Sequence, residues 1–221
     1  MFTEYTYKSL RTYFLTTTYL INSPFKYDPR LRQFSEISRL SRLWYNIMLC
    51  WCFLRTFWQI FLMVASFFWG FPSVADTALE VAFILFNVTV LCMHIIEGIL
   101  YRQILMDFQN KLLNTNAMLK EHFLVQDSNR ILGDGCGIYI RLFTPAAFNL
   151  ALTIGLFFLI QPHSRMYFYS WLPVEKSMLT LICYSWWECY SNCWQMGIFF
   201  TTWFTKLLFA NGCCFWLQEI W

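Results

Sequence analysis

The residues with the greatest capacity for chemistry in this chain are charged and amide side chains set within long apolar segments. Arg55 and Gln59 lie four residues apart in one such segment, which places both on one face of a helix. Polar groups at membrane depth are costly, and they usually face protein or water. These positions therefore predict the inward faces of a helical bundle. The predicted inward residues are Arg55, Gln59, Glu80, Asn87, His94, Glu97, Ser185, Glu188, Asn192, Gln195 and Thr202.

The depth of two of these charges predicts an ion pair. Arg55 lies about 11 residues from the cytoplasmic end of its segment, or roughly 16 Å along a helix. Glu188 lies about 10 residues from the outer end of another segment, or roughly 15 Å. In a hydrocarbon core about 30 Å thick, both side chains reach the middle. We therefore expect Arg55 and Glu188 to pair, the alternative being that each meets a different partner or a water-filled crevice.

His94 and Glu97 lie three residues apart, which resembles half of a carboxylate-bridged metal site. Such sites need matching pairs from other helices, and the chain holds only 3 histidines. We favour a structural or lining role for His94, and we expect no metal and no cofactor. No nucleophile, base and orienting group occur together on an accessible loop, so we do not expect an enzyme.

The composition identifies the environment in which these side chains must work. Apolar residues make up 58% of the 221 residues, aromatic residues 21% and charged residues only 13%. Soluble domains are typically about 45–50% apolar and about 25% charged. This balance excludes a disordered chain, and a net charge of +3 without a basic face argues against a nucleic-acid partner. A lipid bilayer is the expected partner.

Four segments are long and apolar enough to cross that bilayer, since a helical span needs about 20 residues. The predicted fold is an all-α, polytopic transmembrane helical bundle. The expected spans are 44–68, 78–100, 142–160 and 178–205, with a cytoplasmic segment 1–43, a cytoplasmic amphipathic loop 101–141 and a cytoplasmic tail 206–221.

The distribution of Lys and Arg between the loops predicts the orientation of these spans. Seven precede the first span, five lie in 101–141, and Lys206 follows the fourth span. The opposite side carries only Arg165 and Lys176. Because cytoplasmic loops are enriched in positive charge, the N-terminus is expected in the cytoplasm.

The loop 101–141 shows helical periodicity. Its apolar residues predict an amphipathic helix that extends the second span, and Asn114 and Asn116 could break it. The glycine-rich run 133–137 predicts a turn before the third span, with Pro145 in the first turn of that span. The predicted apolar face comprises Tyr101, Ile104, Leu105, Phe108, Leu112, Leu119 and Phe123.

The layout resembles the N-terminal half of an arthropod gustatory or odorant chemoreceptor. The resemblance is carried by the cytoplasmic stretch INSPFKYDPRLRQFSEISRLSRLW (21–44), a short first outer loop, a long basic loop after the second span and an aromatic third loop. Members of that superfamily are seven-span, ligand-gated cation channels of the plasma membrane. The resemblance implies that this chain is a four-span fragment or a truncated product, which we expect not to conduct alone.

The resemblance also implies a small odorant or tastant as ligand and assembly into homo- or hetero-oligomers, tetramers in full-length members. It implies a pocket in the outer half of the bundle, built partly by spans two, three and four. Depth alone selects the candidates, and lipid-facing or core packing is the competing explanation for each of them. The candidate pocket residues are Phe83, Phe86, Phe157, Tyr184, Trp187 and Glu188.

A self-contained four-span scaffold or transporter subunit is the alternative function. A tetraspanin-like protein fits poorly, because the loop between the last two spans is short and contains no cysteine. A transporter would be expected to show internal repeats, and the two halves show no clear similarity.

Overall fold

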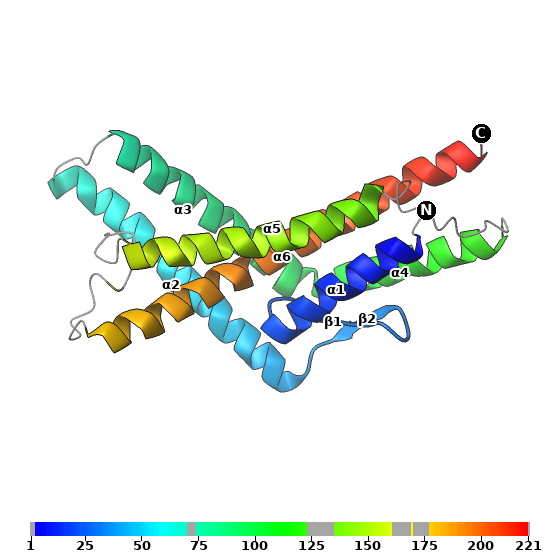
Figure 1. Cartoon of the computed structure of the whole chain (residues 1–221), viewed down its shortest axis with the longest axis horizontal. Helices are drawn as coiled ribbons and strands as arrows, with labels where there is room; N and C mark the ends of the chain where they lie inside the picture. Colours follow the sequence, from blue (N-terminus) through cyan, green and yellow to red (C-terminus); the bar gives the residue numbers. More distant parts are fainter. Residues whose placement is uncertain (1–2, 70–73, 123–134, 161–168, 170–176, 221) are drawn as a thin grey trace.

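The computed structural model describes residues 3–69, 74–122, 135–160, 169 and 177–220. The protein is mostly helical, with one small hairpin near the N-terminus (Figure 1). The predicted loop segments at 70–73, 123–134, 161–168 and 170–176 lie outside the described residues. The elements are α1 (Glu4–Leu20), β1 (Phe25–Asp28), β2 (Gln33–Glu36), α2 (Arg39–Trp69), α3 (Val74–Ile95), a π-helical turn η1 (Ile96–Leu100), α4 (Arg102–His122), α5 (Gly135–Ile160) and α6 (Met178–Ile220).

Among the described residues, three helices are long and apolar enough to cross a membrane, and they fall in the regions predicted for the first three spans. They are Arg39–Ala65, Glu80–Leu100 and Gly135–Ile160. The first begins five residues before the predicted start at 44. The residues predicted as a fourth span form the first part of α6, which runs alongside α5 (Figure 1). The predicted helical character of the chain is therefore confirmed, and three of its helices suit a membrane in length and composition.

The predicted turn before the third span is wrong for the described residues. Gly135, Cys136 and Gly137 do not form a turn but begin α5, so Pro145 lies well inside that helix instead of in its first turn. Cys136 and Ile140 are buried in an aromatic cluster with α1, and this packing favours helix there despite the glycines. α6 continues past 205 to Ile220, so the described part of the predicted tail is helical.

The predicted second span and the predicted amphipathic helix after it join through a π-helical turn. α3 ends at Ile95, η1 follows, and α4 begins at Arg102. Gly98 lies in this turn, where a Cβ atom would collide with the Tyr45 hydroxyl. The close approach of α2 thus requires glycine at this position. Asn114 and Asn116 do not break α4, because Asn116 is buried and its Nδ2 donates to the Tyr7 hydroxyl at 3.3 Å.

The buried face of α4 also differs from the prediction by about one residue. Met106, Gln109, Leu113 and Asn116 are buried, at steps of 3, 4 and 3. Tyr101, Ile104 and Phe108 are exposed, while Leu105, Leu112 and Leu119 are half-buried and Phe123 lies outside the described residues. The polar members fit because α1 and α6 supply hydroxyl partners. Gln109 Nε2, for example, donates to Thr205 Oγ1 at 2.6 Å.

The N-terminal segment forms part of a core with α4, α5 and α6. Figure 1 shows α1 lying beside these helices. Tyr7, Leu10, Tyr13 and Phe14 of α1 are buried. The Tyr13 ring meets Phe204 edge-on at 4.8 Å between centroids, and its hydroxyl donates to the Gly197 carbonyl at 2.7 Å. The residues of this N-terminal aromatic cluster are Tyr7, Leu10, Tyr13, Phe14, Phe25, Tyr27, Phe34, Met106, Leu113, Cys136, Ile140, Phe204 and Leu208.

The hairpin is a feature that the sequence analysis did not predict. β1 and β2 pair antiparallel, with Phe25 opposite Glu36 and Tyr27 opposite Phe34. The outer edge of β2 is covered by Asn110 of α4. The Phe34 N–H donates to Asn110 Oδ1 at 2.7 Å, and Asn110 Nδ2 donates to the Phe34 carbonyl at 3.0 Å. A side-chain amide therefore replaces the third strand that an edge would otherwise invite.

A sharp turn after α1 joins this cluster to the middle of α6. Ile21 adopts the left-handed conformation (φ 51°), which is unfavourable for a β-branched residue. The Leu20 carbonyl accepts from the Tyr190 hydroxyl and the Ile21 carbonyl from Trp194 Nε1, both at 2.9 Å. A Cβ atom on Gly197 would collide with Asn22, so glycine permits this close approach.

Candidate functional site

The candidate site is a cluster of polar side chains between α2, α3 and α6. The predicted inward residues of these helices are buried with few exceptions. Glu80 and Glu97 are only half-buried, whereas the other nine predicted positions are buried. The polar stripes therefore face protein, as the helical spacing predicted.

The predicted pair of Arg55 and Glu188 is present in the structure. Arg55 Nη1 lies 3.2 Å from Glu188 Oε2, and the two side chains are only 4% and 2% exposed. The same nitrogen donates to Asn192 Oδ1 at 3.2 Å. The Arg55 guanidinium also lies 5.9 Å from the centre of the Phe83 ring. Burial of a charge is tolerable here because an opposite charge and a second acceptor surround it.

Side-chain amides extend the cluster on either side of the ion pair. Asn87 Nδ2 of α3 donates to Gln59 Oε1 of α2 at 2.8 Å. Gln195 Nε2 of α6 donates to the Cys52 sulfur at 3.3 Å. Interhelical polar contacts of this type hold membrane helices together. Lipid tails are as apolar as the helix surfaces, so the hydrophobic effect does not drive the helices to associate. The cluster thus links all three helices.

His94 has a structural environment of its own. Its Nδ1 lies 2.8 Å from the Tyr45 hydroxyl, and its ring stacks on Trp194 with 4.1 Å between centroids and 5° between planes. Glu97 is hydrogen-bonded to Thr202 instead of sharing a site with His94. Among the described residues, no group of three or more His, Cys, Asp or Glu side chains could hold a metal ion.

The ion-pair cluster retains hydrogen-bond donors. In the described part of the chain, Arg55 Nη2 and Asn192 Nδ2 are buried and meet no protein acceptor. The adjacent Ser191 hydroxyl is buried beside the Cys52 thiol. Chemically, such donors suit a carbonyl, hydroxyl or carboxylate oxygen of a small molecule. This capacity was not evident from the sequence, which indicates burial but not how many bonds each group makes.

The aromatic pocket candidates fall into separate groups instead of a common pocket. Phe83 lies beside Arg55. Phe86 contacts Phe199 at 6.2 Å between centroids, and Trp187 contacts Trp51 at 5.5 Å. Tyr184 packs with Phe158 and Tyr169. Phe157 belongs to α5, but its side chain lies outside the described residues. Among the described aromatic candidates, Phe83 neighbours Arg55 and Tyr184 neighbours Glu188.

Comparisons of the chain with protein families, curated proteins and solved structures gave no match.

Proposed function

We propose that this chain is a four-span membrane protein with a cytoplasmic N-terminus, in which α6 supplies the fourth span. The excess of Lys and Arg on one side of the predicted spans supports this orientation. The buried face of α6 supports a fourth span, because its polar residues pair with α2 and with Glu97 of η1. On the opposite side of α6, Leu179, Ile182 and Trp186 are exposed. Exposed large apolar side chains suit a helix in lipid.

An epitope tag at each end tests this topology in intact and permeabilised cells. An even number of spans places both ends on the same side, so we expect both tags to react only after permeabilisation. Tags that react on opposite sides would show that α6 does not cross. Tags that both react in intact cells would reverse the orientation.

We further propose that the chain is part of a chemosensory receptor of the plasma membrane, in which a small odorant or tastant gates a cation channel. The observation that carries this proposal is the buried cluster of Arg55, Glu188 and Asn192, with two donor groups that meet no acceptor among the described residues. Ionisable residues at membrane depth typically mark ion or ligand pathways. The resemblance of 21–44 and of the loop pattern supports the receptor class over a scaffold.

Ligand binding to the purified chain in lipid nanodiscs tests the site. The Trp51 and Trp187 rings near the cluster provide a fluorescence signal for a panel of small oxygen-bearing odorants and tastants. We expect saturable quenching that Asn192→Ala weakens about tenfold, the loss of one good hydrogen bond in a dry site. Asn46→Ala, at an exposed position of α2, serves as the matched control. Equal binding by both variants would place the ligand elsewhere, and no quenching by any compound would contradict the receptor function.

A further inference from the structure

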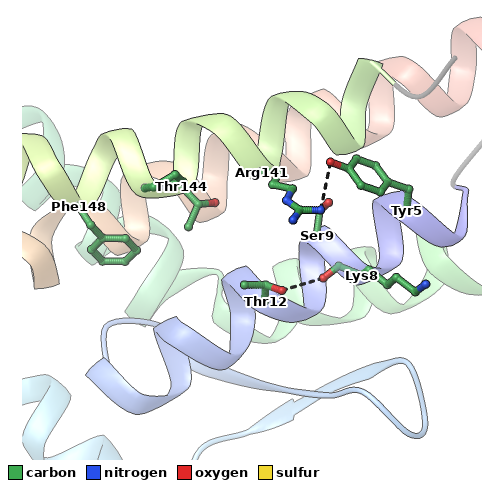
Figure 2. Close-up of a pocket in the computed structure, with 8 residues that line it drawn as sticks. Tyr5, Lys8, Ser9, Thr12, Arg141, Thr144 and Phe148 are labelled. Atoms are coloured by element: carbon green, nitrogen blue, oxygen red, sulfur yellow. Dashed lines mark hydrogen bonds between the residues drawn. The ribbon is translucent and has the colours of Figure 1, made fainter. Parts of the chain in front are cut away.

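A second site lies between α1 and α5, away from the polar cluster. The two helices border a groove of about 480 Å³, within the range of small-molecule sites. Its walls come from Tyr5, Lys8, Ser9 and Thr12 on α1 and from Arg141, Thr144, Pro145 and Phe148 on α5. Figure 2 shows the two sets of side chains facing each other across the groove.

The groove changes in character along its length. Figure 2 shows Tyr5 and Arg141 at one end and Phe148 at the other. Arg141 Nη1 donates to the Tyr5 hydroxyl at 3.4 Å, and the Arg141 guanidinium lies 5.6 Å from the Tyr5 ring centre. The exposed Lys8 side chain lies on the same wall as Tyr5. One end is therefore cationic and the other is apolar.

The cations of the groove have no anionic partner within the described residues. The ion pairs in that part of the chain join Glu36 to Arg42, Glu36 to Arg102, and Arg55 to Glu188. Ser9 is buried on the groove wall. Two charges and a hydroxyl group thus line the groove, a set that suits an oxygen-rich anion.

The position of the groove relative to the predicted span selects among anions. Arg141 directly precedes the span expected at 142–160. Pro145 and Phe148 follow it by four and seven residues, or about 6 and 10 Å deeper along the helix. A cationic end at the membrane surface and an apolar end below it match a phospholipid, with its phosphate at the surface and its acyl chain within.

We propose that this groove binds one anionic phospholipid, with the headgroup phosphate between Lys8 and Arg141 and an acyl chain along Pro145 and Phe148. The Ser9 hydroxyl donates to a headgroup oxygen. The lipid joins the N-terminal helix to the start of α5. The proposed topology would place this lipid in the cytoplasmic leaflet. The binding of the lipid does not depend on that topology.

Binding of a fluorescent anionic phospholipid, phosphatidylglycerol, to the purified full chain in detergent micelles tests the proposal. Phosphatidylcholine with the same acyl chains is the comparison. We expect phosphatidylglycerol to bind more tightly and the variant Lys8→Gln with Arg141→Gln to weaken it roughly thirtyfold, for two surface cations. The matched control is Lys26→Gln with Arg30→Gln, which removes one lysine and one arginine from exposed hairpin positions. It should bind like the unmodified chain.

Other outcomes overturn the proposal. Equal loss in both double variants would show a response to net charge alone. Equal binding of the two phospholipids would remove the role of the cations. Displacement by inorganic phosphate as effective as displacement by unlabelled phosphatidylglycerol would show a phosphate site without a lipid chain. Should the first double variant fail to fold, Lys8→Glu decides, because Lys8 is exposed and the charge reversal must abolish the selectivity. Micelles leave both ends of the protein accessible, so a wrong topology or an absent odorant response would not affect this result.

Discussion

Two buried regions of this protein differ in how much polar pairing holds them together. Within the predicted membrane region, α2, α3 and α6 meet through an ion pair and amides as well as through apolar side chains. In the N-terminal aromatic cluster, α1, the hairpin, α4, α5 and α6 meet largely through Phe, Tyr and Leu side chains. Burial from water stabilises such apolar contacts, whereas lipid gives apolar helices little drive to associate, so helices in a bilayer depend more on polar pairing.

The largest expected effect is at the ion pair. Glu188→Ala leaves the buried Arg55 charge without its counterion and should destabilise the fold by about 3–5 kcal/mol. Thermal unfolding in detergent, followed by size-exclusion chromatography, measures the loss of folded protein. The exposed Glu121→Ala provides the control. The exchange of both charges, Arg55→Glu with Glu188→Arg, should restore part of the stability, and a lack of any restoration would contradict direct pairing.

A pair of similar-sized substitutions compares the two regions directly. Asn87→Leu removes the donor to Gln59 and should cost about 1–3 kcal/mol, because a buried polar contact is lost without loss of volume. Met106→Leu in the N-terminal aromatic cluster should cost less than about 1.5 kcal/mol, because the substitution conserves apolar volume. Chemical denaturation in micelles gives both values. A larger loss for Met106→Leu would reverse the comparison.

A smaller effect is expected at the surface ion pairs that border the N-terminal aromatic cluster. Glu36 contacts Arg42 at 2.6 Å and Arg102 at 3.1 Å, but its side chain is 47% exposed. Glu36→Gln should change stability by about 0–1 kcal/mol and the difference should vanish in high salt. The Glu188→Ala penalty should persist in the same salt. Salt sensitivity of both would mean that water reaches the Arg55 pair.

The smallest effect is a pH dependence confined to the hairpin. The Arg30 and Leu31 N–H groups donate to Asp28 Oδ1 at 2.8 and 3.3 Å, which lowers the pKa of Asp28 below its usual value. This carboxylate therefore stabilises the hairpin at neutral pH, and the contribution is lost as the pH falls through the lowered pKa. Asp28→Asn should flatten the pH dependence of amide exchange at 30 and 31. An unchanged profile would assign that dependence to another group.

The membrane region was the more predictable of the two. A polar group in lipid is so unfavourable that Arg55, Asn87 and Glu188 mark the inward faces by their spacing alone, and the structure buries all three. The pair of Arg55 with Glu188 was predicted as well, whereas the amide partners Asn192 of Arg55 and Gln59 of Asn87 were beyond prediction, since they depend on the rotation and height of neighbouring helices. The aromatic pocket candidates were chosen from too many similar residues, and they fall into separate groups.

The N-terminal aromatic cluster was predicted less well, for a physical reason. Its apolar residues lie in α1 and in strands of four residues, which are too short for a clear periodic pattern. Asn116 was a candidate helix breaker because its partner, Tyr7, lies 109 residues away. The start of α5 was misplaced for the same reason, because the contacts that favour helix at Cys136 come from distant segments.

The turn at Ile21 sets the order in which this protein can fold. Its partners Tyr190 and Trp194 follow Leu20 and Ile21 by 170 and 173 residues, so α1 is synthesised long before α6 exists. At about 5–20 residues per second, the two carbonyl groups of the turn wait roughly 9–35 s for their donors. During that interval the hairpin can already cover Phe14 through Tyr27 and Phe34. Docking of the turn onto α6 is thus among the last steps of assembly.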